Sequence, residues 1–337
     1  MPDTYTTASS NQLGTVRAAY NRMIHFSLRP ELLFDQVATV RATAQAMPGS
    51  SVIFDLVTDL APSTTALDES TDATAVSTSS SGVTVTLSEY GLVMKHTAAL
   101  RAETFCPIDP AIANLIGYNA GVSIDDLVRS PLSGGSNVVY SGSGTSRSDL
   151  NNGTNTAVAN DFLKAAQRLK ANNAPRFGGF YVAYVHPNVS YDVQSASGSP
   201  NWRTPHEYAE PSNIYTGELG AWGGVRFIET PRAPIFGAVS GQFSGGTYSA
   251  SGTSGNSAIF ASIILGQQAL AKAHSITGEY GESPTFVVGP VTDALRRFQP
   301  IGWKHMVGYA RFREACLYRL ESLSSLSSTS DPTINQQ

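Results

Sequence analysis

The sequence predicts an α+β fold that carries two long extensions, and three observations support this prediction. Residues 51–60 and 83–95 are rich in Val, Ile and Thr and flank a polar stretch without apolar periodicity. Residues 108–132 have the spacing of a long helix, and strand-like and helix-like segments are mixed beyond residue 157. Two strands with a long polar tip form an extended hairpin that is only marginally stable alone. We therefore predict a subunit built for assembly.

The first extension covers residues 10–46, which we predict to be helical. Apolar residues recur there at helical spacing, namely Leu13, Val16, Tyr20 and Ile24. The pattern restarts at Pro30, a residue suited to the first turn of a helix. Because these amphipathic segments contain little core of their own, we expect an arm that lies on another surface.

The clearest helix covers residues 108–132. Asp109 can cap it, Pro110 suits its first turn and Pro131 marks its end. Its apolar stripe consists of Ile112, Leu115, Ile116, Ile124, Leu127 and Val128.

The rest of the chain alternates between helix and strand patterns. We predict a helix over 157–174 and a strand within 177–187. Residues 258–275 predict a buried strand that turns at Gly266 into a helix. Residues 302–312 and 315–323 alternate in polarity and are compatible with an antiparallel pair.

Composition restricts the class of protein. Only 14% of the 337 residues are charged and the net charge is -4, which argues against a dedicated nucleic-acid binder. A low charge content suits a surface that partners cover. We predict Cys106 and Cys316 to be buried free thiols. No signal peptide and no apolar run of the roughly 18 residues that span a membrane occur, so we expect a soluble cytoplasmic product without membrane contact.

Motifs for chemistry are absent from the sequence. There is no phosphate-binding loop, no dinucleotide fingerprint and no nucleophile elbow. The six histidines lie far apart along the chain, and none stands three or four residues from another. We therefore expect no catalytic residue, no cofactor and no metal ion.

A compact glycine-rich module covers residues 217–231. Glycines permit a tight backbone turn, Trp222 is expected to fill a pocket, and "VRFIETP" predicts a strand. The residues that we assign to this structural module are Gly217, Gly220, Trp222, Gly223, Gly224, Arg226, Phe227 and Pro231.

This module resembles part of the tailed-phage major capsid proteins, specifically the phage N-four major capsid family. The shared features are a strand that ends in His-Pro at 185–187, the "IY-x-GE-x-G-x-W-x-G-V-RFIET" pattern at 214–230, "G-x-x-A" within 263–269, and "IGWK" at 301–304. The resemblance covers residues 110–310 well, and the arm and hairpin match in layout only. Such proteins have the Hong Kong 97 fold, with an N-terminal arm, extended loop, spine helix, peripheral domain and axial domain.

The resemblance implies a division of the chain into named parts. They are the arm (1–47), the extended loop (48–97), the spine helix with the first peripheral part (98–149), the axial domain (150–284), the second peripheral part (285–325) and a tail (326–337). Some shells of this fold are cross-linked through a lysine in the loop. Here Lys95 lies at the base of the hairpin rather than at its tip, so we do not expect a cross-link.

The resemblance also implies partners and a location. We expect hexamers and pentamers of an icosahedral shell around phage double-stranded DNA, assembled in the host bacterial cytoplasm and retained in the virion. Portal, scaffolding and decoration proteins are possible further partners, and the DNA is expected to lie close by without specific recognition.

Charge counts suggest how neighbouring copies meet. Residues 48–97 contain six acidic residues and one lysine, a net of -5, whereas 285–325 contain six basic and three acidic residues, a net of +3. In this fold the loop reaches the peripheral domain of the next subunit. We therefore predict contacts between acidic Asp68, Glu69 and Asp72 and basic Arg296 and Arg297.

Two alternatives remain open at this stage. One is the shell protein of a bacterial nanocompartment with the same fold. The other is an α+β hydrolase whose active-site residues converge only in the folded chain.

Overall fold

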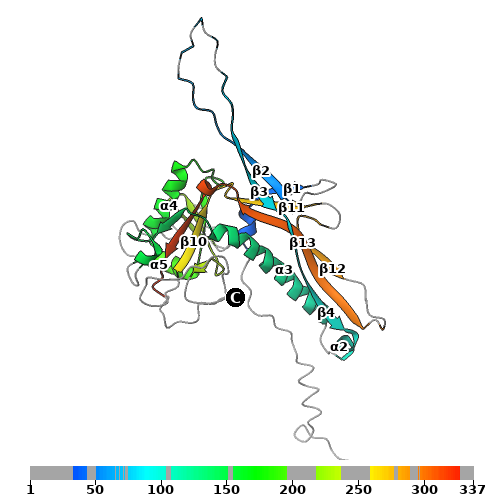
Figure 1. Cartoon of the computed structure of the whole chain (residues 1–337). Coiled ribbons are helices and arrows are strands. Elements are labelled where there is room, and N and C mark those ends of the chain that lie inside the picture. Colours follow the sequence, from blue (N-terminus) through cyan, green and yellow to red (C-terminus); the bar gives the residue numbers. More distant parts are fainter. Residues whose placement is uncertain are drawn as a thin grey trace, which may run out of the picture.

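The computed structural model describes two β-sheets that a long helix joins, with a hairpin that projects far from both (Figure 1). The described residues are 33–43, 51–64, 66–67, 69–70, 72, 75–103, 108–150, 155–195, 218–236, 259–276, 280–288, 295 and 297–326.

The first sheet has five strands: β1 (Thr39–Thr43), β4 (Ser88–Thr97), β11 (Leu270–Ser275), β12 (Thr285–Val288) and β13 (Phe298–Arg311). The long strand β13 organises this sheet, because β4, β11 and β12 all pair with it in antiparallel fashion. Strand β1 adds to the edge of β11 in parallel. The five-stranded sheet thus combines segments from both ends of the chain.

Both faces of the five-stranded sheet are partly covered. Helix α3 (Ile108–Ser133) packs on one face, where Ile116 and Trp303 belong to one buried apolar cluster and the indole of Trp303 donates a hydrogen bond to Asn119 over 3.1 Å. The hairpin of β2 (Ser51–Val57) and β3 (Ser80–Thr86) contributes Phe54 and Val85 to a cluster with Ala271 and Ala273 of β11. The extended hairpin is therefore rooted in this sheet through its base.

The second sheet has seven strands: β5 (Val138–Tyr140), β6 (Tyr181–Val185), β7 (Glu218–Trp222), β8 (Val225–Glu229), β9 (Ile235–Phe236), β10 (Ile259–Leu265) and β14 (Leu317–Ser322). Helices α4 (Ala159–Ala171) and α5 (Pro187–Ser195) contribute side chains to the same core as this sheet. Strands β6 and β10 are buried along their whole length. Phe162 of α4 and Phe227 of β8 lie with ring centroids 4.9 Å apart in the main core.

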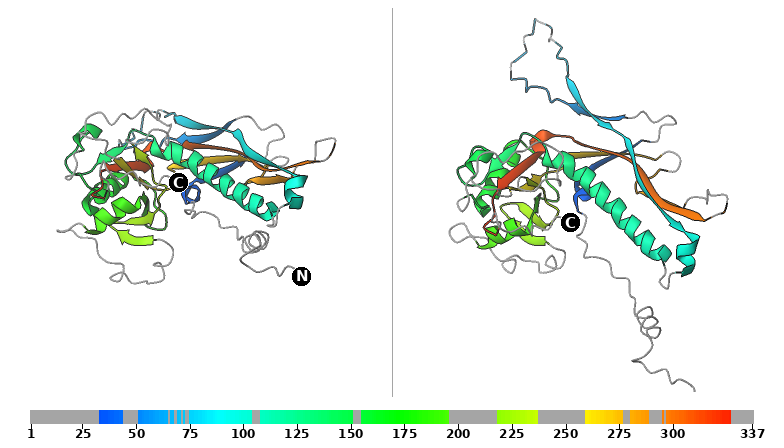
Figure 2. Two further views of the ribbon diagram at one scale, coloured as in Figure 1. Left: turned by 90° about the horizontal axis from the view of Figure 1, so that it is seen from below. Right: turned by 60° about the horizontal axis from the view of Figure 1, so that its bottom comes forward.

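Helix α3 links the two sheets. Its first half packs on the five-stranded sheet, whereas Val128 and Leu132 near its end belong to the main core beside the seven-stranded sheet (Figure 2). The predicted helix over 108–132 is confirmed, and Pro131 lies in its last turn. The predicted strands at 51–60 and 83–95 are also confirmed, except that the second is divided at Leu87 into β3 and β4.

The predicted helical arm is wrong in its last part. Residues 1–32 lie outside the described residues, but Phe34–Val37 form a short 3-10 helix, η1, and Thr39–Thr43 form β1. The β-branched Thr39, Val40 and Thr43 favour an extended backbone once the edge of β11 offers hydrogen-bond partners. Asp35 fastens η1, since its carboxylate lies 2.6 Å from Lys272 Nζ and accepts a 2.8 Å hydrogen bond from the Tyr309 hydroxyl.

The helix predicted after Gly266 is also wrong, because residues 270–275 form β11. Leu, Ala and Lys favour helices, yet every residue of this strand is buried between neighbouring strands and layers. Ala271 and Ala273 are small enough to let the β2–β3 hairpin lie close above them. Packing therefore outweighs the local preference.

The predicted antiparallel pair of 302–312 and 315–323 is wrong in its pairing. Both segments are strands, but β13 lies in the five-stranded sheet and β14 pairs with β10 and β5 in the seven-stranded sheet. The short 3-10 helix η5 (Glu314–Cys316) connects them. Strand β11, predicted within the axial part, likewise belongs to the five-stranded sheet with β13. The named domains remain a prediction. By sheet membership, β11 groups with β13 of the predicted second peripheral part, and β14 groups with the strands of the predicted axial domain.

Three buried histidines with lowered pKa values make the fold sensitive to acid, namely His186, His274 and His305. Burial lowers the pKa of His186 to about 4, and burial together with the nearby Lys272 lowers that of His305 to about 4. In the unfolded chain a histidine titrates near pH 6.5. As the pH falls below 6.5, the unfolded state therefore binds protons that the folded state rejects, and stability is lost until about pH 4.

We predict that the free energy of unfolding of the monomer falls below pH 6.5 with a slope that approaches about 1.4 kcal/mol per pH unit for each histidine by pH 5. Urea titrations at several pH values measure this slope. Burial lowers the pKa of His274 as well, so the His305→Asn variant should show a smaller slope that does not reach zero. An unfolding free energy that is constant from pH 7 to pH 5 would contradict the assignment.

Candidate inter-subunit surface

The extended hairpin presents apolar side chains that its own chain leaves exposed. Burial alternates along β2, where Phe54 points toward the sheet while Ile53 and Val57 are 54% and 67% exposed. Further along the loop, Leu67 and Val76 are more than 70% exposed. Such side chains on a projecting hairpin are expected to be covered by another molecule.

A second apolar surface lies on the five-stranded sheet, beyond the base of the hairpin. Gly302 of β13 is the cross-strand neighbour of Val93 in β4 and of Val287 in β12, so the three residues share one face. They line a hollow of about 370 Å³ together with Gly91, Leu92, Pro300, Trp303 and Lys304. Val93 is 58% exposed and Val287 38%. We call this surface the β4–β12 groove.

Glycine is required in the floor of the β4–β12 groove. A Cβ at Gly302 would lie 2.6 Å from the carbonyl oxygen of Leu92, and one at Gly91 would lie 2.6 Å from that of Trp303. Both contacts are with backbone atoms of the neighbouring strand, which cannot shift without breaking the pairing of the sheet. The groove is therefore a permanent feature of the sheet.

The acidic and basic residues of the predicted charged contact lie far apart within one subunit. Glu69 and Asp72 are exposed on the loop of the hairpin, and Arg297 is exposed beside the start of α2 (Ala98–Glu103), whose Ala98 amide donates to the Arg297 carbonyl (Figure 1). Asp68 and Arg296 lie outside the described residues. Within one subunit Glu69 and Asp72 do not reach Arg297, so a contact would require two copies.

The basic surplus of residues 285–325 is smaller on the surface than in the sequence. Arg319 is buried and lies 2.7 Å from Glu321, and Arg311 lies 3.3 Å from Glu314. Among the described residues of that segment, Arg297 and Arg313 are exposed and Lys304 is partly exposed.

The glycine-rich module forms the hairpin of β7 and β8. Gly223 and Gly224 make its two-residue turn with φ of 63° and 86°, values that favour glycine. Phe227 is only 2% exposed, and Trp222 packs against the core while it is partly exposed, so it does not fill a closed pocket. Arg226 lies in β8, with its guanidinium 5.7 Å from the Phe180 ring. Gly217 lies outside the described residues, and Gly220 lies in β7 as the cross-strand neighbour of Phe227.

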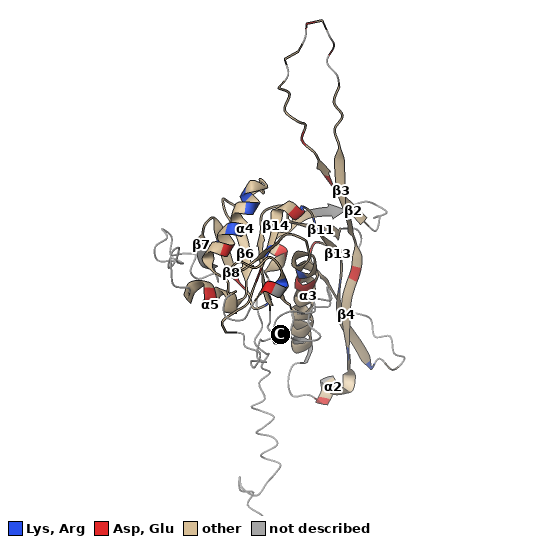
Figure 3. Cartoon of the chain, turned by 60° about the vertical axis from the view of Figure 1, so that its left-hand side comes forward, with Lys and Arg blue, Asp and Glu red and all other residues tan. Residues whose placement is uncertain are grey.

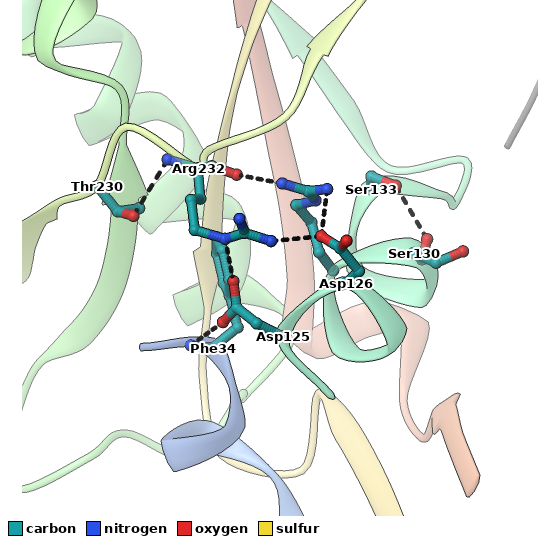
Figure 4. Close-up of polar contacts among 8 residues, drawn as sticks. Phe34, Asp125, Asp126, Ser130, Ser133, Thr230 and Arg232 are labelled. Atoms are coloured by element: carbon teal, nitrogen blue, oxygen red, sulfur yellow. Dashed lines mark hydrogen bonds and ion pairs between the residues drawn. The ribbon is translucent and has the colours of Figure 1, made fainter. Parts of the chain in front are cut away.

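A buried ionic network follows directly after the module, where the chain turns past the exposed Pro231 (Figure 4). Arg232 Nε lies 2.6 Å from Asp125 Oδ2, and the same guanidinium also pairs with Asp126. Arg129 pairs with Asp126 and donates to the Arg232 carbonyl oxygen over 3.0 Å. The Phe34 amide of η1 donates to Asp125 over 3.4 Å. The network thus joins α3, the segment after β8 and η1.

Burial and ionic partners have opposite effects on the pKa values in this network. Burial raises the pKa of Asp125, while the hydrogen bond and charge of Arg232 lower it; burial also lowers the pKa of Arg129. Asp125 and Arg232 are 2% and 5% exposed. Removal of one partner would leave a buried charge without compensation. No sequence motif predicts this network; the signal for it in the sequence is the adjacent pair Asp125-Asp126 inside the apolar stripe of the helix.

The described residues contain no group of three or more His, Cys, Asp or Glu side chains that could hold a metal ion. In the same part of the chain, no helix has the length and hydropathy needed to cross a membrane. Cys316 is a buried free thiol whose pKa is raised by burial, as predicted, and Cys106 lies outside the described residues.

Comparison with known proteins identifies relatives of the whole chain. Residues 6–317 match a family model described as "Phage capsid protein". No curated protein sequence matches the chain. Among solved structures, the capsid of Ralstonia phage GP4 aligns with a TM-score of 0.70 at 16% identity, over 94% of this chain and 95% of that chain. The head structure of Helicobacter pylori bacteriophage KHP40 aligns with a TM-score of 0.67 at 13% identity, over 96% and 99%.

The cyanophage Pam1 capsid aligns with a TM-score of 0.63 at 15% identity, over 97% of this chain and all of that chain. The predicted α+β fold of the Hong Kong 97 type is thereby confirmed. The finer assignment to the phage N-four family remains a prediction.

We predict that Arg232→Met lowers the free energy of unfolding by about 3–5 kcal/mol, because Asp125 is left buried without its partner. Urea denaturation followed by tryptophan fluorescence measures the loss. Asp125→Leu in the same chain should recover most of it. Pro231→Ala, at the exposed neighbouring position, is the matched control. An Arg232→Met variant as stable as this control would contradict the role of the network.

Proposed function

Because the chain belongs to the phage capsid protein family, we propose that its extended hairpin docks in the β4–β12 groove of a neighbouring copy and that this contact builds the shell. The observation that supports this docking is the presence, in one subunit, of two apolar surfaces that the described chain leaves exposed. The hairpin is only two strands wide. Gly91 and Gly302 have no side chains to fill the groove, so the groove has room for it. Contacts repeated between identical copies close a shell of defined symmetry.

The position of the hairpin base on the five-stranded sheet supports docking of a second hairpin in the β4–β12 groove. The inner face of the hairpin base already covers Ala271, Ala273 and Gly308 within its own subunit. The β4–β12 groove lies further along the same strand β13. A hairpin from a second copy would therefore continue the layer that the first hairpin begins.

The protein is a structural capsid protein, and we propose that it forms the hexamers and pentamers of an icosahedral head around double-stranded DNA. Contacts with portal, scaffolding and decoration proteins, assembly in the host cytoplasm, and lack of catalytic activity belong to the same proposal. The family match favours a phage shell over a nanocompartment. No described feature favours a hydrolase.

We predict that replacement of residues 60–77 by Asn-Gly leaves a folded subunit but reduces shell stability. Thr58 and Ser79 already face each other, since the Thr58 amide donates to the Ser79 carbonyl over 3.0 Å, so a two-residue turn can close the hairpin there. Circular dichroism tests folding, and sedimentation with electron microscopy tests assembly. A subunit that unfolds after the replacement would show that the loop belongs to the core.

The groove provides a second variant for the same contact. Val93→Asp should impair assembly because docking would bury a carboxylate. Val40→Asp, on the 44% exposed Val40 of β1, is the matched control. If the Val93→Asp subunits form shells as readily as the control, the hairpin does not dock in this groove.

We also predict a salt-sensitive contact between the loop and the start of β13. Arg296→Glu with Arg297→Glu should impair assembly, and Lys at positions 68, 69 and 72 should partly restore it. Exposed pairs contribute only about 0–1 kcal/mol each and are screened over about 10 Å at 0.1 M salt. Light scattering during assembly at 50 and 500 mM salt measures the effect. Normal assembly of the double reversal at both salt concentrations excludes this contact.

A further inference from the structure

Positive charge gathers at one end of the seven-stranded sheet. Arg168 and Lys170 lie in the last turn of α4, Arg176 precedes β6, and Arg313 precedes η5; all four side chains are exposed. Figure 3 shows the basic residues along α4. We call these four residues the α4 basic surface.

The elements that carry the α4 basic surface are joined by direct contacts. The Asn172 side chain donates to the Ala315 carbonyl oxygen over 3.3 Å, two residues from Arg313. Lys170 Nζ lies 3.3 Å from the Gly223 carbonyl oxygen. Residues 267 and 268 bridge the remaining elements, because the Gln267 amide donates to Pro175 and the Arg313 amide donates to Gln268. The four cations therefore lie at the same end of the seven-stranded sheet.

The carboxylates of this part of the molecule are engaged elsewhere. The partners are Thr145 for Asp149, Lys164 for Asp161, Ser325 for Asp192, Ser190 for Glu229, Arg311 for Glu314, and Arg147 and Arg319 for Glu321. Within the described part of the chain, no carboxylate lies within 4 Å of the charged group of Arg168, Lys170, Arg176 or Arg313. The surface thus carries uncompensated positive charge although the whole chain has a net charge of -4.

Aromatic rings hold three of the guanidinium groups. Arg168 lies 6.0 Å from the centroid of Tyr318, Arg176 lies 5.4 Å from that of Tyr181, and Arg313 lies 5.9 Å from that of Phe312. A guanidinium that a ring orients loses less freedom when it binds, and its planar donors match phosphate oxygens. Contacts of this kind position a nucleic acid backbone without reading its sequence.

We propose that the α4 basic surface binds the phosphate backbone of duplex DNA without sequence preference. The choice of DNA rests on the proposed function, because a phage shell encloses this polyanion. An acidic partner on the same part of a neighbouring copy is disfavoured, since the described carboxylates there are engaged within the subunit. The proposal requires this surface to face the packaged DNA in the assembled shell.

The test uses unassembled subunits of the full chain and a fluorescent 30-base-pair duplex of mixed sequence. Each phosphate contact contributes about -0.9 to the slope of log affinity against log salt, so four contacts give a slope of about -3.6. Fluorescence anisotropy between 50 and 200 mM salt should show this slope. In Arg168→Gln with Lys170→Gln, the slope should fall by about half and the affinity at 50 mM salt by at least about tenfold.

The matched control for DNA binding is Lys95→Glu, which lowers the net charge by the same two units at an exposed residue of β4 in the other sheet. It should bind DNA as the unaltered chain does. Equal binding by the double variant and this control would overturn the proposal. Tighter binding of polyglutamate than of DNA at equal charge would also overturn it and indicate an acidic protein partner.

Sedimentation of each variant under assembly conditions separates this proposal from the proposed function. If the unaltered chain forms shells but its subunits do not bind DNA, the DNA surface is refuted while the shell function stands. If the unaltered chain forms no shells, the shell function fails, and the anisotropy measurement still decides whether the surface binds DNA.

Discussion

The network around Arg232 is the interaction on which the arrangement of the whole subunit depends. Asp125 and Asp126 lie on α3, where the helix leaves the five-stranded sheet and enters the main core. Arg232 comes from the segment between β8 and β9, and Phe34 comes from the N-terminal side of β1. A buried guanidinium is costly unless all of its partners are in place. The network therefore specifies one orientation of α3 relative to both sheets.

This network also fixes the positions of the two apolar surfaces that we assign to assembly. The hairpin base is seated on β11 and β13, and the β4–β12 groove lies in the same five-stranded sheet. Both surfaces are consequently held at a constant distance and angle within one subunit. A shell of many copies needs such constancy, because a small angular error repeated around a ring prevents closure.

The subunit divides its polar and apolar surfaces in a way that suits assembly. Exposed apolar residues concentrate on the hairpin and on β4 and β12, whereas exposed cations concentrate at the end of α4. Most carboxylates of the seven-stranded part are engaged in internal contacts. The low charge content noted in the sequence thus reflects surfaces reserved for contacts with other molecules.

By itself, the sequence determined the elements whose signals are local. The apolar stripe of 108–132 predicts α3, the β-branched runs predict the hairpin, and adjacent Gly223 and Gly224 predict the turn between β7 and β8. Only the tertiary structure decided the state of β1 and β11, because Thr39–Thr43 pairs with the edge of β11, and Leu270–Ser275 pairs with β13 on its other side. The same holds for β13 and β14, which lie in different sheets, and for the pairing of Arg232 with Asp125 across 107 residues. Periodicity reports which face of a segment is buried, but the partner that buries it is a property of the assembled fold.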